Sequence, residues 1–140
     1  MKIPTRPASW LVIIAVYIAM TFVLSSFSVG PVFKFPFWRR WDLLAHFIEY
    51  GLLAWLILRY HLSRAEPARW AWPAWSAVLW SGGVGGLNEL WQLHTPGRLS
   101  SVSDFAANLA GALVVVWLSH YWYLKGTKQT PQGRQNVARN

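Results

Sequence analysis

Few residues of this chain could do chemistry, and most of them lie near the ends of apolar segments. The sequence has 140 residues, with five acidic residues and four histidines. Asp42, His46 and Glu49 are spaced i, i+4 and i+7, which places them on one face of a helix. Glu89 lies near the end of one apolar segment and Asp104 near the start of the next. Carboxylates and an imidazole can exchange protons, accept hydrogen bonds from a ligand or bind a metal ion.

Other polar residues accompany these groups. Gln92 follows Glu89 by three residues, Asn108 follows Asp104 by four, and Arg98 lies in the turn between the two segments. A guanidinium can bind a carboxylate in bidentate fashion, so Arg98 is the natural counter-ion for Glu89 or Asp104. Ionised groups within a membrane usually face a partner or a water-filled cavity. We therefore predict one shared polar pocket, with the binding residues Asp42, His46, Glu49, Glu89, Gln92, Arg98, Asp104 and Asn108.

The chemistry of this pocket stays open at the level of sequence. In an enzyme, His46 and Glu49 or Glu89 would serve as base and acid, with Asp104 orienting the imidazole. A metal held by His46, Glu49, Glu89 and Asp104 would have ligands that suit Zn, Mn or Fe. A single histidine gives little support for such a centre, and the sequence predicts no metal and no cofactor. In the structural alternative, these residues only join helices through hydrogen bonds and an ion pair.

The elements that position these residues are apolar stretches of membrane-spanning length. A bilayer core of about 30 Å requires roughly 20 apolar residues in a helix. Hydrophobic residues make up 54% of the chain and charged residues 13%, more apolar surface than a soluble domain of this size could bury. We predict an all-α integral membrane four-helix bundle in residues 1–124, followed by a disordered basic cytoplasmic tail in residues 125–140. The predicted spans are residues 8–27, 42–62, 70–93 and 103–124.

The distribution of Lys and Arg predicts the orientation of these spans. Nine basic residues precede the first span, lie around the second connection or follow the last span: Lys2, Arg6, Arg59, Arg64, Arg69, Lys125, Lys128, Arg134 and Arg139. Four lie in the first and third connections: Lys34, Arg39, Arg40 and Arg98. Basic loops stay in the cytoplasm, so we expect a multi-pass protein of the cytoplasmic (inner) membrane with both termini inside. The polar pocket then lies at the outer face.

Small residues indicate close helix packing. Gly82 and Gly86 form a GxxxG face, and Ala107 and Gly111 repeat this spacing on the last span. We expect the Gly82/Gly86 face to be able to form a homo-oligomer. Ser101 resembles a helix N-cap, with Asp104 three residues later in the place of a capping-box acid, so the last span should begin near Val102. The basic residues form no single face, which argues against nucleic acid as a partner and leaves membrane lipid.

At these residues the sequence resembles the VanZ-like family of small membrane proteins. The first similar block runs from Asp42 through His46, Phe47 and Glu49 to Gly51. The second contains a Glu and a Gln, a Pro-Gly-Arg turn, and an Asp followed by Asn and Gly: Asn88, Glu89, Gln92, Pro96, Gly97, Arg98, Asp104, Asn108 and Gly111. The family often has a Lys between the Asp and the His-Phe pair, where this chain has residues 43–45, Leu-Leu-Ala. The resemblance covers residues 42–118 and implies a four-helix membrane fold. It also implies a link to the cell envelope, because the founding member confers resistance to the glycopeptide teicoplanin.

Three functions remain open from the sequence. The first, which we favour, is a binding protein whose outward pocket takes a lipid headgroup, a cell-wall precursor or a glycopeptide antibiotic. The second is a membrane enzyme that acts on a lipid-linked substrate by acid–base chemistry. The third is a small transport or structural subunit, which would have to oligomerise or join a partner.

Overall fold

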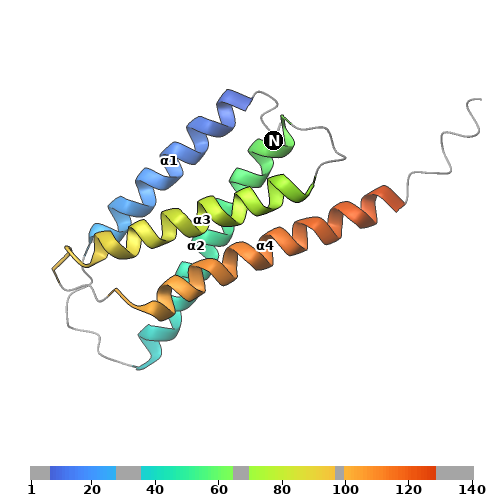
Figure 1. The fold of residues 1–140 in the computed structure, drawn as a ribbon. Coiled ribbons are helices and arrows are strands. Elements are labelled where there is room, and N and C mark those ends of the chain that lie inside the picture. Colours follow the sequence, from blue (N-terminus) through green and yellow to red (C-terminus); the bar gives the residue numbers. More distant parts are fainter. Residues whose placement is uncertain (1–6, 28–35, 65–69, 97–99, 129–140) are drawn as a thin grey trace, which may run out of the picture.

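The computed structural model describes residues 7–27, 36–64, 70–96 and 100–128, with side-chain positions for all of these except 36–40 and 126–128. These ranges contain four helices and no strand: α1 (Pro7–Ser26), α2 (Pro36–Leu62), α3 (Ala71–Gln92) and α4 (Val102–Lys128). The prediction of an all-α chain is therefore confirmed. In Figure 1, the C-terminal ends of α1 and α3 lie at the same end of the molecule as the N-terminal ends of α2 and α4. The alternating directions of the helices thus bring the described polar residues of α2, α3 and α4 to one end.

Two helix boundaries differ from the predicted spans. α2 begins at Pro36, six residues before the predicted start, and the fixed φ of proline suits the first turn of a helix. α4 begins at Val102 as predicted but continues to Lys128, into the stretch predicted as a disordered tail. Lys125 Nζ lies 4.6 Å from the centre of the Tyr121 ring one turn earlier, and this cation–π contact favours the helical extension. Residues 129–140 lie outside the described residues.

Three of the four described helices are long and apolar enough to cross a membrane: α1, α2 from Trp41 onward, and α4. In α1, polar side chains are among the few that are buried, and many aliphatic side chains are exposed. Its buried residues are Trp10, Thr21 and Ser25, whereas Val12 and Val16 are each 63% exposed. A helix that turns hydroxyls inward and aliphatic side chains outward is suited to a lipid surrounding rather than to water.

α3 differs from the other three helices in composition. Glycines, serines and polar residues near its C-terminal end make it less apolar, and it is not among the helices that meet the hydropathy requirement for a span. Its distribution of side chains is nevertheless the same as in α1. Ser81, Asn88 and Glu89 are buried, whereas Leu79 is 66% and Trp80 65% exposed. The apolar side chains of α3 therefore cover its outer surface.

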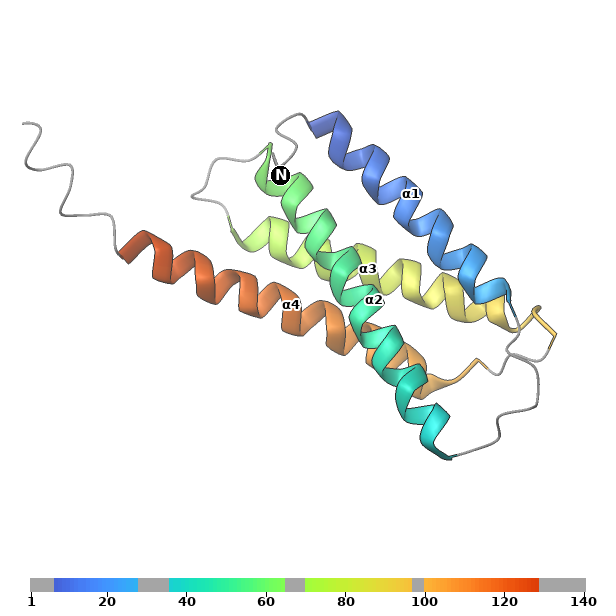
Figure 2. The same cartoon turned by 180° about the vertical axis from the view of Figure 1, so that it is seen from behind.

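The closest helix approach is between α2 and α4, which have the most extensive contact in the molecule. Figure 2 shows α2 crossing both α3 and α4. A Cβ atom on Gly111 of α4 would overlap the carbonyl oxygen of Phe47 of α2, and one on Gly51 would lie 3.2 Å from the Gly111 oxygen. These two glycines let the backbones meet. Around them a buried core forms from Tyr50, Leu53, Ala54, Ile57, Leu58, Ala77, Val78, Ala112 and Val116.

The predicted Gly82/Gly86 face packs within the chain. A Cβ on Gly82 would lie 3.4 Å from Leu109 of α4, and one on Gly86 would lie 3.5 Å from Phe105. Both are ordinary van der Waals distances. An open apolar groove of about 330 Å³ remains along this face between α3 and α4. Oligomerisation through it stays a prediction.

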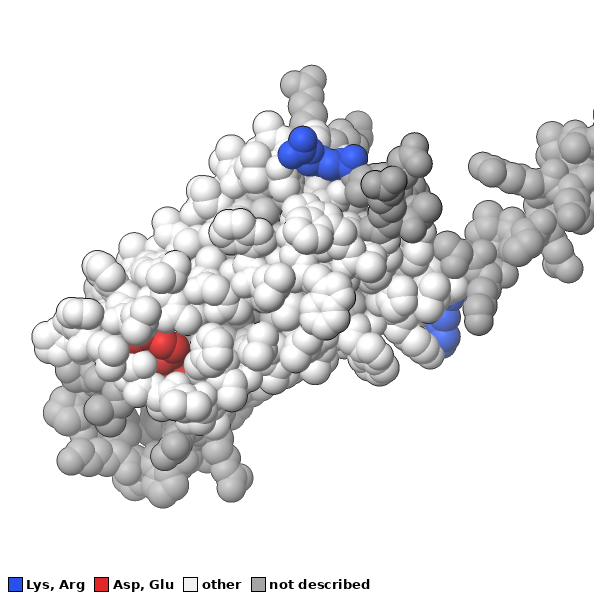
Figure 3. Space-filling view, in the orientation of Figure 1, with Lys and Arg blue, Asp and Glu red and all other residues white. Residues whose placement is uncertain are grey.

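Side-chain hydrogen bonds join the helices at several depths. Ser81 Oγ donates to the Tyr50 carbonyl oxygen over 2.8 Å, and Ser76 Oγ lies 2.8 Å from His61 Nε2. The charged groups lie toward the ends of the molecule. On the face in Figure 3, described acidic residues are visible near one end, described basic residues toward the other, and an uncharged surface lies between them.

Candidate functional site

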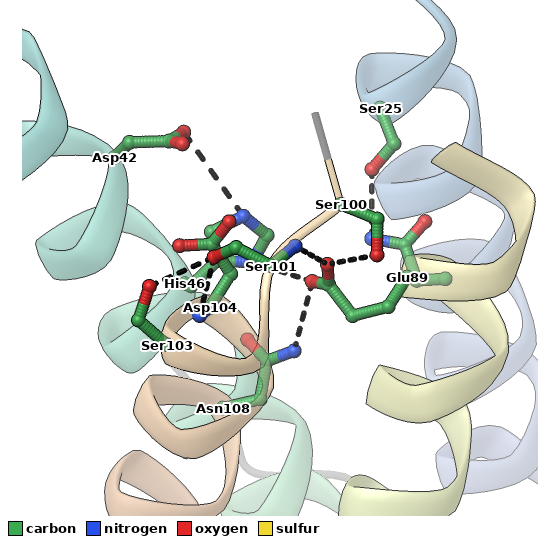
Figure 4. A network of polar contacts seen from close by, with 10 residues as sticks. Ser25, Asp42, His46, Glu89, Ser100, Ser101, Ser103, Asp104 and Asn108 are labelled. Carbon is green, nitrogen blue, oxygen red and sulfur yellow. Dashed lines mark hydrogen bonds and ion pairs between the residues drawn. The ribbon is translucent and has the colours of Figure 1, made fainter. Parts of the chain in front are cut away.

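The polar site lies at the end of the molecule where α3 gives way to α4, and three helices contribute to it (Figure 4). α2 supplies His46, α3 supplies Glu89, and α4 supplies Asp104 and Asn108. All four side chains are buried. Asp42, one turn before His46, is 47% exposed and lies at the rim of the site. The structure thus brings five of the predicted binding residues together at one end of the molecule, and their binding of a ligand stays a prediction.

His46 lies between two carboxylates. Its Nε2 is 4.0 Å from Asp42 Oδ1, and its Nδ1 is 3.8 Å from Glu89 Oε1. Both distances exceed that of a hydrogen bond. His46 Nδ1 is buried and has no hydrogen-bond partner among the described residues. A buried polar atom in this state costs about 1–3 kcal/mol, so the site favours a ligand that forms a hydrogen bond with the imidazole.

Glu89 is held from the start of α4. Its Oε2 accepts hydrogen bonds from Ser100 Oγ at 3.1 Å and from the Ser101 amide at 3.4 Å. Its Oε1 accepts a long hydrogen bond from Asn108 Nδ2 at 3.5 Å. This carboxylate therefore closes the site on the side of α3 and fixes the segment that leads into α4.

Ser101 caps α4 as predicted, but its backbone amide donates to a different carboxylate from the one expected. Ser101 Oγ accepts a hydrogen bond from the Asp104 amide at 3.1 Å, which is the first half of the predicted capping box. The amide of Ser101 donates to Glu89 instead of Asp104. Glu89 reaches the N-terminus of α4 from the neighbouring helix, and the Asp104 carboxylate lies with Asp42 and His46.

The ligand-type atoms of Asp42, His46 and Asp104 lie within 4.8 Å of one another. This group differs from the metal-ligand set weighed from the sequence, which comprised His46, Glu49, Glu89 and Asp104. Sequence spacing shows which residues share a helix face, but not which helix that face meets.

The remaining predicted site residues have separate positions. Gln92 is buried in the last turn of α3. Glu49 is partly buried, and its backbone carbonyl accepts a hydrogen bond of 3.0 Å from Tyr17 on α1. Of the two glutamates that the sequence offered as the acid beside His46, Glu89 has its Oε1 3.8 Å from His46 Nδ1. Arg98 lies outside the described residues.

Sequence reasoning missed the contribution of α1. Asn88 Nδ2 donates to Ser25 Oγ at 2.8 Å, and both side chains are buried. One residue later, Ser26 Oγ accepts a hydrogen bond of 2.9 Å from the Trp91 indole. The available signal was the pair of hydroxyls that ends an otherwise apolar segment. These contacts fix the end of α1 to the end of α3, beside Glu89.

Comparison with known proteins identifies the family of this chain. A family model described as VanZ/LLP1 matches residues 9–123. This range includes the central part of each of the four helices and every described residue of the site. Neither the curated proteins nor the solved structures contain a match. Because the family match extends over most of the 140 residues, the chain belongs to the VanZ/LLP1 family.

Proposed function

We propose that this protein crosses the cytoplasmic membrane four times and recognises a polar group of an envelope molecule at the outer surface. α3 is the fourth span in this proposal. Its 22 residues correspond to about 33 Å at about 1.5 Å per residue, enough for a bilayer core. Its polar side chains are buried and its large apolar side chains are exposed, so a lipid surrounding would meet an apolar surface.

The basic residues support an orientation with both termini in the cytoplasm. Arg59, Arg64 and Lys125 lie toward the ends of α2 and α4 that are remote from the polar site. Cytoplasmic loops are enriched in Lys and Arg, and the acidic site is then at the outer end. Trp41 and Trp91 belong to that end and are each 51% exposed, as is typical of tryptophan at a membrane interface.

The observation that carries the proposed recognition is the shared location of three carboxylates and one imidazole from three helices. Ionised carboxylates only accept hydrogen bonds. The described part of the site therefore suits a ligand that presents hydroxyl, amide or ammonium donors. Lipid headgroups, cell-wall precursors and glycopeptide antibiotics all carry such donors. Asp42 at the rim is 47% exposed, so a ligand at the membrane surface can contact this member of the site directly.

Mass spectrometry of molecules that co-purify with the protein tests this proposal. The wild-type protein and a Glu89→Gln variant would be extracted from the same membranes. Gln keeps the size of Glu but removes its charge, so we expect at least one donor-rich lipid or precursor to be lost or strongly reduced. Ser119→Ala is the matched control, because Ser119 bonds only its own helix at the Val115 carbonyl among the contacts described. Identical molecules on the wild-type and Glu89→Gln proteins would count against recognition at this site.

A second assay connects the site to the glycopeptides that the family resemblance suggests. Cells that produce the wild-type protein, the Glu89→Gln variant or neither would be compared for susceptibility to teicoplanin. Protection by the wild-type protein alone supports binding of the drug or of its cell-wall target. Equal susceptibility of all three strains removes the glycopeptide from the proposed ligands.

Acid–base catalysis on a lipid-linked substrate is a second candidate function. The specific observation in its favour is the imidazole of His46 between Asp42 and Glu89, at 4.0 and 3.8 Å. Such an arrangement can orient a histidine that transfers a proton. Profiling of lipids and cell-wall precursors in cells with and without the protein separates the two candidates. A new or depleted molecule indicates catalysis, and an unchanged profile leaves binding.

A further inference from the structure

We propose that Asp42, His46 and Asp104 bind a divalent transition-metal ion. Their ligand-type atoms already lie within 4.8 Å of one another, and they come from two helices, α2 and α4. This inference goes beyond recognition of an envelope molecule, because it concerns an ion and can be tested without any lipid ligand.

The separations of the three side chains are close to those of a metal centre. Ligands about 2.1 Å from a tetrahedral ion are about 3.4 Å from one another. Asp42 Oδ1 and His46 Nε2 are now 4.0 Å apart, so each needs to move by only a fraction of an ångström. Asp42 and His46 are one helical turn apart on α2, a spacing that places two ligands on one face.

The state of His46 is the second observation that points to a ligand. The residue is 5% exposed, and its Nε2 lies 4.0 Å from Asp42 Oδ1, too far for a hydrogen bond. Its Nδ1, on the side of Glu89, has no hydrogen-bond partner among the described residues. A metal-binding histidine usually donates its other ring N–H to a carboxylate. With an ion bound to Nε2, the ring proton would be on Nδ1, and this N–H would point toward Glu89 Oε1, now 3.8 Å away.

Glu89 is well placed for this supporting role. Ser100 Oγ and the Ser101 amide hold its other oxygen, so the carboxylate is oriented independently of any ion. The site then contains a carboxylate–histidine–metal sequence in which Glu89 positions His46 and does not bind the ion. In the set weighed from the sequence, Glu89 would have been a ligand.

Charge and access agree with an ion at this place. The charges of two ionised aspartates and one divalent cation sum to zero. This neutralisation reduces the free-energy cost of an ionised Asp104 in a buried position. Asp42 is 47% exposed, so an ion in solution can reach this ligand first. Three protein ligands leave at least one coordination position for water or for a polar ligand. One nitrogen and two carboxylate groups suit Zn²⁺ or Mn²⁺.

Metal analysis of the purified full-length protein in detergent tests the proposal. After removal of bound ions with EDTA, the protein would be titrated with ZnSO₄ and separately with MnCl₂ by isothermal calorimetry. We expect one ion per chain for at least one of the two metals. His46→Gln and Asp104→Asn should each weaken that binding at least tenfold, and Glu89→Gln should weaken it by a smaller factor.

The controls separate the site from adventitious binding. His94 is an exposed histidine after the last turn of α3, and its replacement in His94→Gln should leave the affinity unchanged. Far-UV circular dichroism shows whether each variant is folded. If a buried variant does not fold, Asp42→Asn provides the same test at an exposed position. Binding of neither metal by the wild-type protein, or equal binding by the wild-type and Asp42→Asn proteins, would overturn the proposal.

Discussion

Replacement of Gly111 by alanine tests the close approach of α2 and α4 that supports the site. The added Cβ would overlap the Phe47 carbonyl oxygen and lie 2.8 Å from its carbon and 3.0 Å from its Cα. All three atoms belong to the backbone of α2, so no side-chain rotation can relieve the overlap, and the helices must separate. Overpacking of this kind costs up to about 3 kcal/mol. The higher helix propensity of alanine returns about 1 kcal/mol, which leaves a net loss of about 2 kcal/mol.

Gly83→Ala is the matched control for this prediction. Gly83 lies inside α3, and a Cβ there would meet nothing within 4 Å. The same change of residue should therefore leave the protein unaffected or stabilise it by up to about 1 kcal/mol. The two variants should differ by about 2–3 kcal/mol in reversible unfolding by SDS in mixed micelles, followed by circular dichroism. Equal stability of the two variants would refute the packing of α2 against α4 described above.

Gly111 also connects packing to the polar site. It lies seven residues after Asp104 on α4, which is two turns or about 10 Å along the helix. An added methyl group at this position would push α4 away from α2 and so change the position of the start of α4 relative to His46. We therefore expect Gly111→Ala to weaken metal or ligand binding even at a temperature where the variant is fully folded.

Further predictions concern the polar contacts between helices. In a double-mutant cycle of Ser25→Ala and Asn88→Ala, the coupling free energy should be about 0.6–1.7 kcal/mol, measured by SDS unfolding, and a value of zero would contradict the hydrogen bond between them. Tyr17→Phe removes the bond to the Glu49 carbonyl and should cost about 0.5–1.5 kcal/mol in the same assay. Glu89→Ala removes the carboxylate oxygen that accepts the hydrogen bonds of both Ser100 and Ser101. It should increase protease cleavage in the α3–α4 connection, and unchanged cleavage would show that Glu89 does not hold this segment.

These predictions share a physical origin, because the molecule buries polar side chains beside its apolar core and exposes many large apolar ones. Large aliphatic and aromatic side chains cover the outside, while Ser76, Ser81 and Asn88 are buried. In lipid, apolar contacts gain little over those with the surrounding chains, so packing and interhelical hydrogen bonds must hold the helices together. The same buried polarity that joins the helices also provides the groups from which the candidate site is built.

The sequence by itself determined the helices and the polar end of the molecule. Long apolar stretches are sufficient to predict helices, because a backbone without water must satisfy its own hydrogen bonds. The helical period of 3.6 residues placed Asp42 with His46 and Asp104 with Asn108, and Ser101 marked the start of α4. The motifs of the VanZ-like resemblance were also visible, and the family match over residues 9–123 confirms the family.

Only the tertiary structure decided which of these groups meet. The rotation of each helix about its axis and the crossing of α2 over α4 depend on packing, such as the contact of Gly111 with Phe47, which no local pattern encodes. For this reason the sequence left Glu49 and Glu89 open as the acid beside His46, whereas the structure places His46 between Asp42 and Glu89. The link from Ser25 to Asn88 joins residues 63 positions apart, a contact that local spacing does not indicate. Spacing along one helix sets which residues share a face, and the packing of several helices sets what that face contacts.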